Sequence, residues 1–199
     1  EDTKFCWDGV AARAEWIALK QISLGKVTFT NSNNAAIVTE YDVDYLIPAE
    51  QKIGVSVSYS TGTGAKPLTV DIPKALKLGK KLYGATYKFV FMNVDTFEKF
   101  ASQEEVYKKC ASFVQNVVGS QDAPDLATVN AYLAKKKELY RGLQIIVIDQ
   151  DITLELADGS RLTENPFEDD VMLFSESKVL GNTYWKKPID AKAMPGSVA

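Results

Sequence analysis

Histidine is absent from the 199 residues, so the chain lacks the side chain that most often serves as a general base or a metal ligand. Its two cysteines, Cys6 and Cys110, are too far apart in sequence to match the spacing of a metal site. We expect buried free thiols, and a single disulfide between them is the alternative. From these absences we predict no catalytic residue, no metal ligand and no cofactor.

Long apolar runs and an excess of positive charge are also missing. No run approaches the roughly 20 apolar residues of a membrane-spanning helix, so we expect no membrane partner. The formal net charge of −3 gives no overall basic field, and we expect any contact with DNA to be non-specific. Hydrophobic residues nevertheless make up 46% of the chain, which is enough to bury a core as one domain or as two small ones.

The stretch 60–66, STGTGAK, is the clearest candidate for a phosphate-binding loop. A Walker loop requires Ser or Thr directly after its Gly-Lys pair, and a dinucleotide loop requires GxGxxG between a strand and a helix. Here Lys66 is followed by Pro67, and neither spacing is met. The stretch therefore predicts a linker between two parts of the chain.

Paired carboxylates are the remaining candidates for chemistry. Asp42 and Asp44 are two residues apart on a predicted strand, so both project from one face, where solvent is the usual environment. Asp149 and Asp151 lack the glycine and the closing glutamate of a calcium-binding EF-hand loop. A hydrolase that uses Asp42, Asp44 or residues 168–170, or a binding module, is the alternative that these carboxylates leave open.

The first third of the chain predicts a helix followed by strands. Apolar residues recur at helical spacing over 7–24, and Asp8 suits the positive end of such a helix. The predicted buried stripe consists of Val10, Ala14, Ile17, Ala18 and Ile22. We expect Gly25 to end the helix as a left-handed cap. Alternating apolar residues then predict strands over 27–29, 37–47 and 53–59.

From residue 67 onwards, helices and strands alternate. We expect Asp71 to cap a helix that ends at Gly84, and Asp95 with Glu98 to form a capping box at the start of the next one. Longer helices are predicted over 103–118 and 124–140. Strands are predicted over 87–92, 145–148, 152–156, 171–174 and in a segment closed by Gly181. The apolar run 145–148 indicates a strand that is buried on both faces.

The order of these elements carries a resemblance to a known family. A long helix ending in LGK at 24–26 runs into strands, and PLTVDIPKALKL then leads to KFVFMNVDTFEKF. Near the end stand GLQIIVID at 142–149, NPFEDDVMLF at 165–174 and VLGNTYWKKPI at 179–189. From about residue 7 to 189, this order resembles the major capsid proteins of tailed bacteriophages, the lambda-type coat proteins with the Hong Kong 97 capsid fold.

The resemblance implies an α+β fold with a long spine helix, a peripheral β-rich domain and a mixed α/β axial domain. The peripheral part would cover 1–65, the axial domain would cover 66–178, and 179–199 would form an incomplete return into the peripheral domain. The family's N-terminal arm and the long hairpin loop before the spine helix have no counterpart here, so we expect a fragment or a processed chain.

The implied function is that of a structural coat protein of a phage or prophage, and not of an enzyme. Its main partner is expected to be itself, in hexamers and pentamers of an icosahedral shell. A scaffold or decoration protein and packaged DNA are further expected contacts. Such a protein is made in the bacterial host cytoplasm and becomes part of the virion. An encapsulin-like compartment shell on the same fold is the alternative.

Two polar loops of the predicted axial domain are candidates for contacts between subunits at the centre of each ring. They lie around 120–125 and 160–169. The contact residues predicted in them are Ser120, Gln121, Asp122, Asp125, Ser160, Arg161, Glu164 and Asp169.

Overall fold

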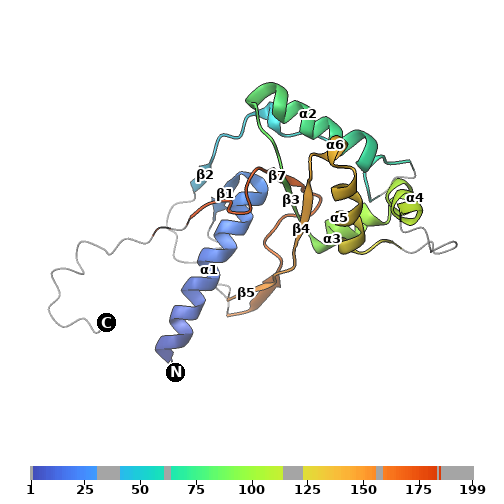
Figure 1. Cartoon of the computed structure of the whole chain (residues 1–199). Coiled ribbons are helices and arrows are strands. Elements are labelled where there is room, and N and C mark those ends of the chain that lie inside the picture. The colour runs from blue at the N-terminus through green and yellow to red at the C-terminus, as the bar shows by residue number, and fades with distance from the viewer. Residues whose placement is uncertain are drawn as a thin grey trace.

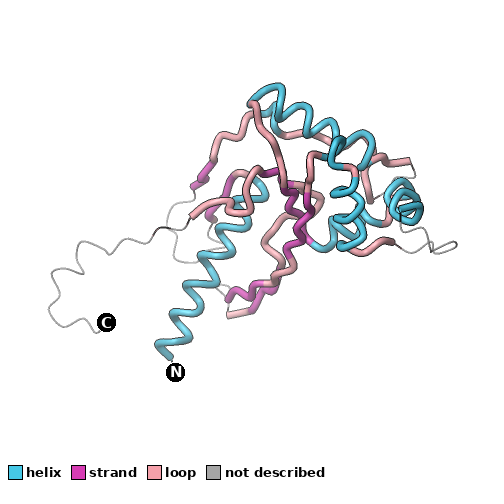
Figure 2. The backbone as a smooth tube through the Cα atoms, viewed as in Figure 1, coloured by secondary structure: helices cyan, strands magenta, loops and turns pink. Residues whose placement is uncertain are grey.

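The computed structural model describes residues 2–30, 41–60, 64–113, 123–155, 159–182 and 184. The described chain mixes helices and strands (Figure 1, Figure 2), which confirms the α+β class. Its helices are α1 (Asp2–Leu24), α2 (Ile72–Tyr83), α3 (Val94–Ala101), α4 (Glu104–Phe113), α5 (Leu126–Lys135) and α6 (Lys137–Tyr140). Its strands are β1 (Lys26–Phe29), β2 (Tyr41–Asp44), β3 (Phe89–Asn93), β4 (Gln144–Ile148), β5 (Ile152–Glu155), β6 (Arg161–Glu164) and β7 (Leu173–Ser175).

A three-stranded mixed sheet organises the larger part of the molecule. Strand β3 is its centre, with β4 parallel on one side and β7 antiparallel on the other. The helices α2 to α6 gather around this sheet (Figure 1). Together they bury what we call the large core: Leu68, Ile72, Leu76, Val90, Met92, Phe100, Val106, Cys110, Val129, Tyr132, Leu133, Tyr140, Leu143 and Ile145.

A second, smaller group of buried residues lies beside α1. It is built from Trp16 of α1, from alternate residues of β1, and from alternate residues of β5. Its members, which we call the Trp16 cluster, are Trp16, Val27, Phe29, Ile152 and Leu154. The antiparallel hairpin β5–β6 and the antiparallel pair β1–β2 are separate two-stranded sheets. The buried and exposed alternation predicted for these strands is confirmed in β1 and β5.

Helix α1 is longer than predicted and packs through a different residue. It begins at Asp2, so Asp8 does not lie in its first turn as expected. Val10 and Ala14 of the predicted stripe are exposed, whereas Trp16 is only 6% exposed. Strands β1 and β5 contact α1 at the position of Trp16, so the large indole side chain packs against them in place of the predicted stripe. The predicted cap is confirmed, since Gly25 has a φ of 71° and its N–H donates to the Gln21 carbonyl.

Two of the early strand predictions need correction. Within the predicted strand 37–47, the described residues form a strand only over Tyr41–Asp44, because the backbone then turns at Leu46, which has a positive φ. The prediction of a strand over 53–59 is wrong. That segment is a loop whose polar groups bond to Asp71: Ser56 N–H and Oγ at 3.1 and 3.2 Å, and Tyr59 Oη at 2.9 Å.

Two predicted helix caps are also wrong. Asp71 makes no capping bond to α2, because its carboxylate is used by the 53–59 loop and a π-helical turn (Pro67–Asp71) precedes the helix. The cap of α3 is Asn93, whose Oδ1 accepts from Thr96 N–H at 2.8 Å, and not Asp95. At α3 the side chain of the last residue of β3 takes the capping role predicted for Asp95, whereas no side chain caps α2.

The later elements follow the predicted order, but β6 was not predicted, and of the helix expected over 103–118 residues 114–118 lie outside the described part of the chain. The helix expected over 124–140 breaks at Lys136 into α5 and α6. Strand β4 is an edge strand in which only Ile145 is fully buried, and the strand enclosed on both sides is β3. No strand forms in the described residues next to Gly181. No helix in the described part of the chain has the length and apolar character needed to cross a bilayer.

Candidate functional site

The predicted contact loop at 120–125 is described only at its end. Ser120, Gln121 and Asp122 lie outside the described residues. Asp125 is the N-cap of α5, where its Oδ1 accepts from Thr128 N–H at 2.9 Å. The side-chain and backbone hydrogen bonds of Thr128 hold the pKa of this carboxyl below its ordinary value. Asp125 therefore has a structural role at the helix start, and its contact with another subunit stays a prediction.

The two ends of the second predicted loop pack in different places: Glu164 contacts the Trp16 cluster, and Asp169 lies beside the large core. Ser160 and Arg161 are exposed at the end of the β5–β6 hairpin, and Glu164 is half-buried. Trp16 Nε1 donates to Glu164 Oε1 at 2.7 Å, which ties the hairpin to α1. The Arg13 guanidinium lies over the same indole, 4.5 Å from the ring centroid. Burial lowers the pKa of Arg13, while Glu164 opposes this shift.

Asp169, the last predicted contact residue, lies near the carboxyl end of β3. Asn93 Nδ2 donates to its carboxylate and to the Phe167 carbonyl. Beside it, Lys99 pairs with Asp170 at 2.8 Å, and this hydrogen bond raises the pKa of Lys99. On the other side of the loop, Lys20 of α1 pairs with Glu168 at 2.7 Å. Asp169 thus lies far along the loop from Ser160, held to the large core and not to the hairpin.

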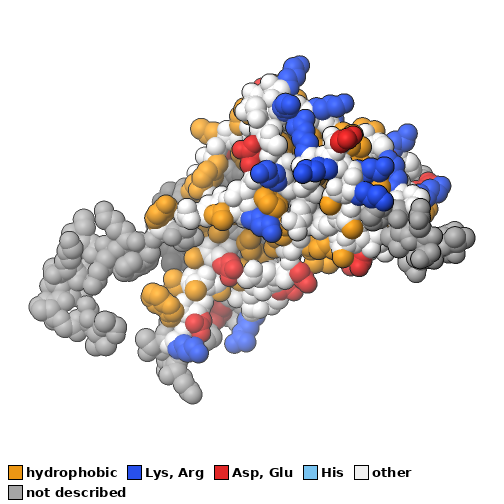
Figure 3. Space-filling view, viewed as in Figure 1, with side chains coloured by type: hydrophobic (Ala, Val, Ile, Leu, Met, Phe, Trp, Pro, Cys, Tyr) orange, Lys and Arg blue, Asp and Glu red, His pale blue; other side chains and the backbone are white. Residues whose placement is uncertain are grey.

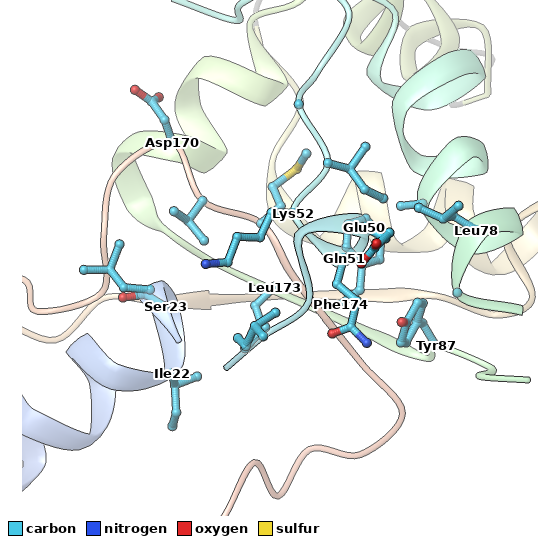
Figure 4. Close-up of a pocket in the computed structure, with 18 of the residues that line it drawn as sticks. Ile22, Ser23, Glu50, Gln51, Lys52, Leu78, Tyr87, Asp170, Leu173 and Phe174 are labelled. Carbon is cyan, nitrogen blue, oxygen red and sulfur yellow. The ribbon is translucent and has the colours of Figure 1, made fainter. Parts of the chain in front are cut away.

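A cleft of about 620 Å³ lies between the end of α1 and the large core. The last turn of α1 and the 47–54 segment form one side, and α2 and β7 form the other. Figure 4 shows Lys52 reaching across it, with Ile22 and Ser23 on one side and Leu78 and Tyr87 on the other. Its volume is that of a small-molecule site, and its lining is mostly apolar.

The carboxylates that an enzyme would need are dispersed or engaged. Asp42 and Asp44 are exposed on β2, and Asp44 Oδ1 accepts from Leu46 N–H. Glu168 and Asp170 are paired with lysines, as described above. No group of three acidic or cysteine side chains in the described ranges is placed to hold a metal ion.

Sequence reasoning missed a polar network that joins the loop 53–60 to the helices. Glu105 of α4 accepts from Leu68 N–H at 2.9 Å and from Thr69. Burial opposes ionisation of Glu105, but these hydrogen bonds outweigh it and lower its pKa. Burial and the hydrogen bond to Asp71 raise the pKa of Tyr59. The sequence gives little indication of this network, because Glu105 and Leu68 are 37 positions apart and no local spacing connects them.

Cys110 is a free thiol in the large core, as expected. It is almost fully buried, and burial raises the pKa of the thiol to about 11. A thiol of this kind is a small apolar side chain and not a nucleophile. The side chain of Cys6 lies outside the described residues.

Comparison with known proteins gives matches among solved structures alone. No family model matches the chain, and no curated protein matches its sequence. Among solved structures, a crystal structure from Escherichia coli CFT073, described as the proposed capsid protein of a prophage, matches with a TM-score of 0.47 and 16% identity. The match covers 83% of this chain and 44% of the other, so this chain spans less than half the length of that protein.

Proposed function

We propose that this chain is a structural coat protein, the major capsid protein of a tailed phage or prophage with the Hong Kong 97 fold. The order of sequence phrases from the first helix to 179–189 supports this assignment. In this proposal α1 is the spine helix, the part up to residue 65 is peripheral, and 66–178 is axial. The protein would be made in the host cytoplasm and act in the virion without catalysis.

The observation that carries the proposal is the unburied half of α1. Its 23 residues make a rod of roughly 35 Å at about 1.5 Å per residue. In Figure 1 the N-terminal part of this rod extends past the β5–β6 hairpin. Trp7 and Val10 there are 70% and 67% exposed. An aromatic and an aliphatic side chain held in water on a rigid helix are typical of a surface that another protein covers.

Such a helix supports self-assembly through contacts between unlike surfaces. A surface on one copy that fits a different surface on the next copy generates rings when the rotation closes. Each contact is weak by itself, but a subunit held by several neighbours dissociates rarely. Hexamers and pentamers of a shell need no chemistry beyond such contacts. Scaffold or decoration proteins would add to them, and packaged DNA would be touched without sequence preference.

Electron microscopy of the full-length protein tests the proposal. We expect closed shells or ring-shaped capsomers, and particles purified from the host should contain DNA. Shells filled with a cargo protein and free of genome would instead support an encapsulin-like compartment. A full-length protein that remains a monomer at high concentration, alone and with its natural assembly partners, would contradict both.

A further inference from the structure

One face of the large core is unusually rich in lysine. Helix α2 buries Ile72, Ala75, Leu76 and Gly79 on its inner side. Its outer side exposes Lys74, Lys77, Lys80 and Lys81, and the helix contains no acidic residue. Helix α6 contacts α2 and begins beside the exposed Lys136 and Lys137. We call these six lysines the lysine ridge; Figure 3 shows blue side chains gathered over the upper part of the molecule, where Figure 1 places α2 and α6.

The ridge is not neutralised within the described molecule. The ion pairs among the described residues involve Lys20, Lys99, Lys108 and Lys109, and none of the six ridge lysines. The acidic residue nearest in sequence is Glu138, the second residue of α6. The ridge therefore presents several unpaired positive charges on two adjacent helices.

The opposite end of the same strands is acidic. Strands β3 and β4 are parallel, and the chain that follows each of them carries exposed carboxylates. The loop 165–170 is fastened there by Asn165 Nδ2, which donates to the Ile148 carbonyl at 3.0 Å, and by Asp170 N–H, which donates to Thr96 Oγ1 at 2.9 Å. We call this surface the acidic edge; its members are Asp95, Asp149, Asp151 and Asp169, and the neighbouring Glu168 and Asp170 are paired with Lys20 and Lys99.

The strand direction separates the two surfaces. Helix α2 ends at Gly84 shortly before β3, and α6 ends at Tyr140 shortly before β4, so the ridge adjoins the amino ends of both strands. Five residues of strand span roughly 17 Å at about 3.3 Å per residue. This exceeds the Debye length of about 8 Å at physiological ionic strength. The ridge and the edge of one molecule are therefore largely screened from each other.

We propose that the lysine ridge of one copy docks on the acidic edge of a second copy of this chain. The contact deepens the proposed coat function and rests on it, because it is a contact between unlike surfaces that repeats from copy to copy. Charge complementarity selects this occupant. The same molecule carries a matching acidic surface, and its net charge of −3 gives no overall basic field to attract a nucleic acid.

A charge-exchange experiment on the full-length protein tests the pairing. One variant reverses the ridge (Lys80→Glu with Lys81→Glu), and the other reverses the edge (Asp149→Lys with Asp151→Lys). These four side chains are exposed and belong to neither core, so folding should be retained, and circular dichroism checks this. Lys52→Glu with Lys66→Glu is the control, because it changes the net charge equally at exposed lysines that lie off the ridge and form none of the ion pairs above.

Assembly is measured by sedimentation velocity in buffers of low and high salt. We expect each reversed variant alone to need on the order of tenfold more protein to assemble, because like charges then face each other. An equimolar mixture of the two should recover most of the assembly, since alternating copies in a ring of six pair every ridge with an edge of opposite charge. The control should assemble normally.

Three outcomes would overturn the pairing. If the original protein assembles but the mixture does not recover, the docking is wrong and the coat function stands. If ridge reversal leaves assembly unchanged but abolishes retention of duplex DNA in a gel-shift assay, the ridge binds nucleic acid instead. If the original protein does not assemble under any condition, the coat function fails together with the docking.

Discussion

The large core and the Trp16 cluster differ in how many apolar side chains this chain buries in each. The large core encloses a central strand, and aromatic side chains from several helices are fully buried in it. The Trp16 cluster consists of five residues from one helix and two narrow hairpin-like sheets. Because burial of apolar area is the main source of stability, the first region should be much more stable than the second.

Several exposed apolar residues lie in the region around the Trp16 cluster, while Val70, Leu82, Tyr83 and Leu139 are exposed beside the large core. Trp7 and Val10 lie on the helix of the Trp16 cluster, and Val43 and Leu46 lie on or next to β2, which pairs with its strand β1. In an assembled shell, neighbouring copies would bury the apolar side chains that this region leaves exposed in a single copy. The weak region of the single chain is therefore the region that we expect to be ordered by contacts.

The largest effect should come from opening a cavity in the large core. Phe100 is fully buried, and its ring packs edge-on against Tyr59 with 6.2 Å between centroids. We expect Phe100→Ala to lower the free energy of unfolding by about 3–5 kcal/mol, measured by urea denaturation. Leu139→Ala, at a position that is 50% exposed, is the control and should change it by less than about 0.5 kcal/mol. Equal effects of both substitutions would contradict the assignment of the core.

Alkaline pH should also destabilise the large core selectively. Burial raises the pKa of Cys110 from 9.0 to about 11, and burial also raises the pKa values of Tyr59 and Tyr140. A raised pKa means that the folded state keeps a proton that the unfolded state releases, so stability is lost as the pH rises above the unfolded value. We expect Cys110 alone to lower the free energy of unfolding by about 2 kcal/mol between pH 9 and 11, and the two tyrosines to lower it further above pH 10.

Denaturation curves across this pH range measure the effect. In a Cys110→Ala variant the fall should begin near pH 10, where unfolded tyrosines titrate. A stability that is constant from pH 9 to 11 would show that these groups are not buried.

A smaller effect is expected from the polar network that holds the 53–60 loop. Asp71→Ala removes the acceptor of three hydrogen bonds from Ser56 and Tyr59. Losing these part-buried hydrogen bonds to a carboxylate should cost about 1–3 kcal/mol. Asp95→Ala is the matched control, because Asp95 is exposed and does not cap α3. If Asp95→Ala were the more damaging change, the cap assigned to Asn93 would be wrong.

The smallest effect should appear in the Trp16 cluster. Trp16→Phe keeps an aromatic ring but loses the hydrogen bond to Glu164, which is worth about 1 kcal/mol. We expect faster amide exchange in α1 and in β5, with little change in the exchange of β3. A uniform change over all three segments would mean that the two regions unfold as one unit.

The sequence indicates the elements whose signals are local. Gly25 and Gly84 end their helices as expected, and Asp125 caps α5, because a left-handed glycine or an N-cap is fixed by its immediate neighbours. The helical spacing of Val129, Tyr132 and Leu133 also indicates the face of α5 that packs in the large core.

What the sequence could not indicate depends on distant partners. Nothing near Trp16 predicts that it meets Glu164, which is 148 positions away. The segment 53–59 alternates like a strand, but its polar groups bond to Asp71 and no partner strand is offered to it in the described chain. The lysine ridge was visible only as separate basic residues, because α2 and α6 become neighbours through the tertiary fold.

Hydrogen exchange measured by mass spectrometry on residues 4–15 tests the central claim most directly. The full-length protein is compared as free subunits and as assembled particles. We predict that amides in this half of α1 exchange quickly in free subunits and become strongly protected in particles, whereas β3 is protected in both. Equal exchange of 4–15 in both states would contradict the claim that neighbouring copies cover the exposed helix.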